Sequence, residues 1–300
     1  MRLNKKEKWK SYGFVFAMLF IPVVHFLIFW VGVNFNSIKL AFTDIDAETG
    51  ALSFTLKHFK SLVNNLKTGT LQTAIFNTLL TSAFNFIFLM PWAIFLTYFM
   101  YKKIPLTSFW RIMLFLPTVI PAIAMTAIFN YLIDVNGPVG EIWKSMTGQE
   151  LPMLMSFDKY AKWTVLFYFF WTNFGGQFLL ISSAMSRIPK ELLEAASLDG
   201  AGMWTEFRKV ILPLCWPSIS MILILNMSSM FTAGAPVLLL SYGMAGTTNI
   251  NYWIYERVSG AVSFNLSLPA AMGIACTAIL FPIIMTTKWL LGRVYKDVEF

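Results

Sequence analysis

The chain has 300 residues, of which 57% are hydrophobic and 13% are charged. Soluble domains carry about a quarter charged residues, so this composition excludes a chain that buries its apolar surface in one water-soluble core. The formal net charge of +8 fits attraction to anionic lipid headgroups, and nucleic-acid binding is not needed to explain it.

Six stretches of the chain are long and apolar enough to cross roughly 30 Å of hydrocarbon. The first follows the basic segment MRLNKKEKWK, but it is about 20 residues long and lacks an A-x-A cleavage site, so we expect an uncleaved first span. We therefore expect an all-α, polytopic membrane protein with six transmembrane helices. The predicted spans are residues 13–33, 74–100, 112–133, 163–186, 214–240 and 267–291.

The charged residues between these stretches predict an orientation. With the N-terminus in the cytoplasm, the whole formal charge of +8 falls on the cytoplasmic side, and the outer loops sum to zero. This distribution predicts cytoplasmic N- and C-termini. No repeat of 20 to 50 residues is evident, so we expect a cytoplasmic segment at 1–12 and one six-span domain at 13–300.

The cytoplasmic loop between the fourth and fifth stretches, residues 187–213, has the pattern of a short exposed helix. Pro189 suits a first helical position, Glu191 suits a helix N-terminus, and Gly200 and Gly202 permit a sharp stop. One side of this helix is apolar and low in relief, which suits docking into a shallow cleft of another protein. The residues on that side are Leu192, Leu193, Ala195, Ala196 and Leu198.

The same loop contains a Glu-Ala-Ala triplet at 194–196, then Gly200 and a V-x-L-P ending at 210–213. This arrangement resembles the EAA loop of binding-protein-dependent ABC importer permeases, with Val210 where the family pattern has Ile. The resemblance implies the transmembrane-domain fold of type I ABC importers and a coupling helix that docks on a separate ATPase. It assigns ATPase coupling to Glu191, Glu194, Ala195, Ala196, Leu198, Asp199 and Gly200.

The resemblance also implies partners and a location. The partners are a second permease subunit, identical or different, two cytoplasmic ABC ATPase subunits and an extracytoplasmic solute-binding protein. The ATPase subunits would bind ATP and Mg²⁺, so this chain itself would need no cofactor and would not be an enzyme. The implied location is the bacterial cell membrane.

Residues 14–300 look more broadly like the maltose-type carbohydrate permeases. The likeness includes the segment LQTAIFNTLLTSAFNFI, which opens the second span, and the closing spans. It implies a sugar or oligosaccharide as cargo. Members of the group that carry glycerol phosphate or other small polar solutes share much of this likeness, so those cargoes remain an alternative.

Aromatic rings, amides and hydroxyls in the fourth and fifth spans are the groups that a sugar site needs. Asn173 and Gln177 share one helical face, and a second polar stripe begins at Asn226. Core packing or an interfacial belt is the alternative for the aromatic rings, and hydrogen bonding between helices is the alternative for the polar stripe. The predicted substrate path contains Trp171, Asn173, Gln177, Asn226, Ser229, Phe231 and Thr232.

Two other classes of membrane protein are alternatives to an ABC permease. An ion-coupled secondary transporter or channel usually places carboxylates or other ionisable groups at membrane depth. The predicted spans contain no Asp or Glu, and their only Lys or Arg is Lys288 near the end of the sixth. A membrane-embedded enzyme would need a catalytic motif such as H-E-x-x-H or G-x-S-x-G, and neither occurs. The sequence also has no P-loop and no Cys/His cluster with metal-ligand spacing.

Overall fold

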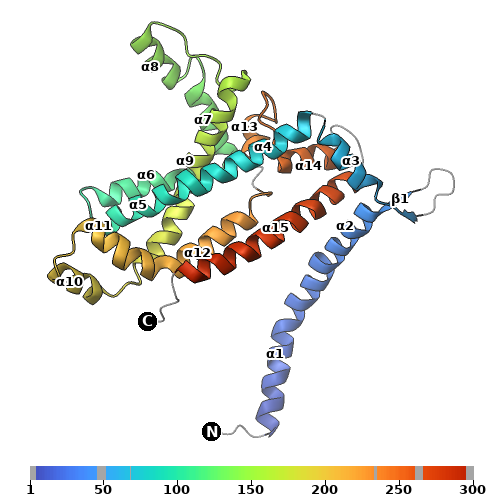
Figure 1. The fold of residues 1–300 in the computed structure, drawn as a ribbon, viewed down its shortest axis with the longest axis horizontal. Helices are drawn as coiled ribbons and strands as arrows, with labels where there is room; N and C mark the ends of the chain where they lie inside the picture. The colour runs from blue at the N-terminus through green and yellow to red at the C-terminus, as the bar shows by residue number, and fades with distance from the viewer. Residues whose placement is uncertain (1–4, 46–51, 68, 233–234, 261–265, 295–300) are drawn as a thin grey trace. The chain divides into compact units, whose positions relative to one another are not determined.

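Helices form nearly all of the regular structure in the computed structural model, which describes residues 5–45, 52–67, 69–232, 235–260 and 266–294 (Figure 1). The first four residues of the predicted N-terminal segment lie outside the described residues. Contacts divide the chain into two units, residues 1–64 with 257–277, and residues 65–256 with 278–300.

The first unit begins with one continuous helical stretch made of α1 (Lys5–His25), the π-helical η1 (Phe26–Gly32) and α2 (Val33–Phe42). Its membrane-spanning part is Tyr12–Phe42, which is longer than the predicted 13–33. No residue of its most apolar window is buried within the chain, as a helix in contact with lipid requires.

A short hairpin follows this helix. Strands β1 (Thr43–Ile45) and β2 (Leu52–Phe54) pair antiparallel, with Thr43 opposite Phe54. Helix α3 (Lys57–Asn65) then packs beside the hairpin, where His58 Nε2 lies 3.1 Å from the carbonyl oxygen of Thr43.

The second predicted span is one helical stretch in the second unit, made of α4 (Gly69–Phe84), η2 (Asn85–Leu89) and α5 (Met90–Tyr101). The wider π-helical turn lies directly before Pro91, which cannot donate an N–H to the preceding turn. The stretch Gly69–Tyr101 is long and apolar enough to cross a membrane.

The third predicted span, 112–133, is present as a bent pair of helices and not as one straight helix. The chain forms α6 (Thr107–Val119) and α7 (Ala122–Ile133), with α8 (Pro138–Thr147) after them. The stretch Ala122–Thr147, which contains α7 and α8, is bent by 110° from α6. Ile120 is extended, with ψ of 135°, because the ring of Pro121 disfavours the helical conformation in the preceding residue. The described residues thus contain five candidate spans, or six if this bent pair counts as one.

Helix α9 (Asp158–Met185) is the centre of the second unit and corresponds to the predicted fourth span. It packs against α4, α5, α6 and α12. The approach to α6 is close at Gly175, where a Cβ atom would collide with the Thr118 side chain and with the Leu114 carbonyl oxygen 2.8 Å away. Gly175 therefore allows α9 and α6 to pack closely, as small residues do between membrane helices.

After α9 the chain forms α10 (Lys190–Leu198), α11 (Met203–Glu206), the π-helical η3 (Phe207–Ile211) and α12 (Leu212–Ser228). The predicted fifth span, 214–240, is wrong at its end, because the helix stops at Ser228. The Ser228, Ser229 and Thr232 hydroxyls donate to carbonyl oxygens three or four residues earlier, and such bonds compete with helical backbone pairing.

Three further helices complete the chain. These are α13 (Ala235–Leu240), α14 (Ile250–Val258) and α15 (Ser267–Val294). Helix α15 matches the predicted sixth span, and its residues 267–277 belong to the first unit and 278–294 to the second.

Candidate functional site

Helix α10 ends with a defined C-terminal cap. The Ala201 N–H donates to the Ala196 carbonyl oxygen at 2.9 Å, and the Gly200 N–H donates to the Ser197 carbonyl oxygen at 3.1 Å. These two bonds form a Schellman motif, which requires a left-handed residue, and Gly200 has a φ of +75°. The predicted turn at Gly200 is therefore present.

The surface of α10 is mostly accessible. Leu198 is 89% exposed, and Leu192 is 40% exposed. Leu193 instead packs against the hydrophobic core of the second unit, and the nearby Ile188 is buried in that core. The predicted coupling residues Glu191, Glu194, Ala195, Asp199 and Gly200 are exposed, and Ala196 is half-buried.

The chain after α10 is anchored more firmly. Phe207 and Ile211 are buried in the core of the second unit, together with Met185 from the end of α9. The short helix α10 thus lies between two buried segments, and this arrangement is stiffer than a loop held only at its ends. A stiff element can carry a displacement into the helices that flank it.

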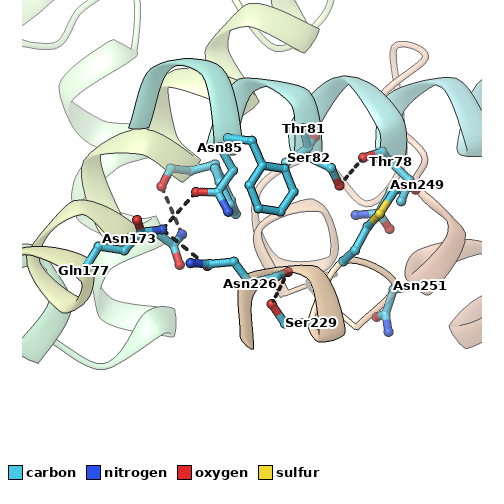
Figure 2. Close-up of a pocket in the computed structure, with 13 residues that line it drawn as sticks. Thr78, Thr81, Ser82, Asn85, Asn173, Gln177, Asn226, Ser229, Asn249 and Asn251 are labelled. Carbon is cyan, nitrogen blue, oxygen red and sulfur yellow. Dashed lines mark hydrogen bonds between the residues drawn. The ribbon is translucent and has the colours of Figure 1, made fainter. Parts of the chain in front are cut away.

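A polar pocket lies where α4, η2, α9 and the end of α12 meet (Figure 2). Gln177 is one of the residues that line it and is 7% exposed. Its Nε2 atom donates to Asn85 Oδ1 at 2.9 Å and lies 3.3 Å from Asn226 Oδ1. Its Oε1 atom is buried and has no hydrogen-bond partner among the described residues, so the amide carries one acceptor that the surrounding side chains do not satisfy.

All residues that line the pocket are uncharged. Amides and hydroxyls predominate, with two phenylalanine rings and a methionine beside them. The lining residues are Thr78, Thr81, Ser82, Asn85, Phe86, Phe169, Asn173, Gln177, Asn226, Ser229, Met230, Asn249 and Asn251.

The cavity volume is about 70 Å³. This space holds about five water molecules, so it is too small for a sugar ring in this conformation. Helices around the pocket would have to move apart before a larger solute could enter.

Four residues of the predicted substrate path line the pocket, namely Asn173, Gln177, Asn226 and Ser229. Trp171, Phe231 and Thr232 are not among its lining residues. The Trp171 ring packs 5.9 Å from the Phe129 ring. The Phe231 carbonyl oxygen accepts a hydrogen bond from Asn251 Nδ2 at 3.4 Å, and the Thr232 hydroxyl donates to the Ser229 carbonyl oxygen at 3.0 Å.

The second span provides pocket residues that the sequence analysis missed. Thr78, Thr81, Ser82 and Asn85 are spaced at i, i+3, i+4 and i+7, so they share one helical face. A polar stripe on one face of an otherwise apolar span is visible in the sequence, so these four residues could have been predicted to line a pocket. Asn249 directly precedes α14 and Asn251 lies in its first turn. No periodic pattern in this part of the sequence indicates a pocket.

Metal chemistry has no support in the part of the chain that the structure describes, where no group of three or more His, Cys, Asp or Glu side chains comes together. Cys215 and Cys276 are buried and unpaired with each other, in agreement with their apolar sequence surroundings.

Comparisons with known proteins agree with the membrane architecture. The chain is 25% identical, over 94% of both sequences, to the probable starch degradation products transport system permease protein AmyD of Thermoanaerobacterium thermosulfurigenes. It is 32% identical to the sn-glycerol-3-phosphate transport system permease protein UgpA of Escherichia coli O157:H7, over 47% of each chain.

A crystal structure of a bacterial alginate ABC transporter, in complex with an alginate pentasaccharide-bound periplasmic protein, contains a chain of the same fold. The TM-score is 0.82, with 19% identity over 99% of this chain and all of that one. The family model of the binding-protein-dependent transport system inner membrane component matches residues 89–299. The chain therefore belongs to this family and is a multi-pass inner-membrane permease component of an ABC importer, not an enzyme.

Proposed function

We propose that this permease forms half of the translocation path for a neutral sugar or oligosaccharide. The observation that carries the proposal is the uncharged polar pocket around Gln177, whose lining amides and hydroxyls can replace water around sugar hydroxyl groups. Asn173, Asn226 and Ser229 would share this role. Phe231 and Thr232 stay in the proposed path because each is hydrogen-bonded to a residue that lines the pocket. Trp171 stays in it as a prediction from the sequence.

Three comparisons bear on the cargo, and one of them is a transporter of alginate, which is an acidic polysaccharide. AmyD is named for starch degradation products, which are neutral oligosaccharides, whereas UgpA is named for sn-glycerol-3-phosphate, which is anionic. An anion would be best accommodated by a cationic side chain, and the residues that line this pocket are uncharged. The pocket therefore favours the sugar over glycerol phosphate.

We also propose that α10 couples transport to a separate ATPase. Its exposed residues, with Leu198 at 89% exposure, would dock in a cleft of that subunit. The full complex would contain a second permease, two ATPase subunits and an extracytoplasmic solute-binding protein. This arrangement places α10 and both termini in the cytoplasm.

Reconstitution of the whole complex in liposomes tests the cargo. The other subunits of this complex are a second permease, two ATPase subunits and a solute-binding protein. We expect maltotriose-loaded binding protein to stimulate ATP hydrolysis and maltotriose uptake. Stimulation by glycerol 3-phosphate and not by any neutral saccharide would overturn the sugar assignment.

The proposed orientation predicts which side of the membrane labels each exposed residue. Leu198→Cys in α10 should react with a membrane-impermeant maleimide only in inside-out vesicles. The matched variant Met146→Cys, at an 80% exposed position of α8, should react only in right-side-out vesicles. The two native cysteines are buried, so their background labelling should be low. The opposite pattern would reverse the orientation and remove α10 from the cytoplasm.

A further inference from the structure

Glu206, the last residue of α11, is a carboxylic acid buried beside the segment that follows α10. It is 4% exposed. Its Oε2 atom lies 2.8 Å from Nζ of Lys102, the residue directly after α5. The Lys102 side chain is 37% exposed and the Glu206 side chain 6% exposed, so the lysine reaches from the surface to a carboxylate that water scarcely touches.

Tyr98, in the last turn of α5, contacts the same segment. Its hydroxyl donates to the Met203 carbonyl oxygen at 2.9 Å and lies 3.4 Å from Glu206 Oε1. The Tyr98 ring lies 4.9 Å from the Phe207 ring, and both residues belong to the core of the second unit. We call Tyr98, Lys102 and Glu206 the Glu206 cluster.

The Glu206 cluster joins two parts of the second unit that are distant in sequence. One part is the loop segment that follows α10, and the other is the end of the second span. The second span continues back through α5 into η2 and α4, which carry Asn85 and the Thr78, Thr81 and Ser82 stripe of the pocket.

Along the chain, α10 is connected to α9 on one side and, through α11 and η3, to α12 on the other. It has no such connection to the second span. If α11 moved away from α5 while Glu206 stayed buried, the carboxylate would be left without its cation, so the ion pair resists such a motion. A displacement of α10 would then be passed on to the second span as well.

We infer that Lys102 and Glu206 are positioning residues that transmit the movement of α10 to the second span and so to the wall of the polar pocket. The inference rests on the proposed coupling role of α10. The coupling role of α10 does not by itself involve the second span, which is not next to α10 in the chain. Lys102 and Glu206 are the side chains that would bring that span into transport.

The test uses the complete reconstituted complex with loaded binding protein and measures solute molecules imported per ATP hydrolysed. Lys102→Met should lower this ratio about threefold to tenfold, the range expected for residues that carry coupling between sites. Lys102→Arg retains the charge and should restore most of the ratio. Lys103→Met makes the same change at the neighbouring exposed lysine and should leave the ratio as in the unmodified complex.

A double variant separates coupling from stability. Lys102→Met alone leaves a buried carboxylate without its cation, which can impair assembly, whereas Lys102→Met combined with Glu206→Gln removes both charges. We expect the double variant to assemble normally, by size-exclusion chromatography, and still to import less solute per ATP.

Recovery of both assembly and the transport ratio in the double variant would overturn the inference, because the ion pair would then only neutralise a charge. A normal ratio in Lys102→Met would overturn it as well. An unmodified complex that hydrolyses ATP with no response to loaded binding protein would instead overturn the proposed function.

Discussion

Gly200→Val should lower solute uptake by the complete complex about tenfold or more, while the permease remains in the membrane. Gly200 has a φ of +75° and ends α10 through the Schellman motif. A β-branched residue is a conformational outlier at positive φ, so the C-terminal turn of α10 should rearrange. The exposed face that we propose for ATPase docking would then change its direction. Uptake, ATP hydrolysis and co-purification of the ATPase subunit measure the effect.

Gly202→Val is the matched control for this loss. Gly202 lies two residues further on, has an ordinary φ of −67° and ψ of 163°, and an added Cβ would meet nothing within 4 Å. Extended backbone of this kind suits valine. We therefore expect near-normal uptake in Gly202→Val. Equal uptake in the two variants would show that the shape of this turn does not matter for coupling.

Gln177→Leu should lower the uptake efficiency for the neutral saccharide by about tenfold, the change produced by roughly 1.4 kcal/mol of lost binding. The substitution removes the Nε2 donor to Asn85 and Asn226, and it removes the buried Oε1 acceptor that has no partner among the described residues. Leucine has a similar size, so the packing of α9 should change little. Initial uptake rates at several concentrations of loaded binding protein measure this effect.

Gln72→Leu makes the same replacement at an exposed position of α4 that does not line the pocket. We expect its uptake to match that of the unmodified complex. Size-exclusion chromatography of both variants should show intact complexes. An intact Gln177→Leu complex with normal uptake would remove Gln177 from the proposed path and leave it as a residue that joins three helices.

The family match decides between the function classes that the sequence left open. Residues 89–299 match the inner membrane component of binding-protein-dependent transport systems, which supports the ABC permease over an ion-coupled transporter or an embedded enzyme. The EAA triplet at 194–196 was the informative local feature, because it lies in a loop of the right length before the fifth span. Apolar spans by themselves indicate a membrane protein of any class.

Span positions were predicted well where a single apolar helix is uninterrupted, as in α9 and α15. Hydropathy did not reveal the bend of 110° that follows the break before Ala122 in the third span. The prediction of the fifth span failed at Ser228, where local hydroxyl-to-carbonyl bonds end α12 before the apolar residues end. Hydropathy measures affinity for lipid, and it does not register the backbone preferences that stop a helix.

The membrane setting, the short helix before Gly200 and the amides of the fourth and fifth spans could all be predicted from the amino-acid sequence. These features depend on apolar length, on backbone preference and on residues close together in the chain, all of which can be read locally. Only the tertiary structure decided that Gln177 contacts Asn85, 92 residues away, and that Glu206 pairs with Lys102, 104 residues away. Such contacts depend on which faces of separate helices meet, and that choice is made by packing of the whole unit.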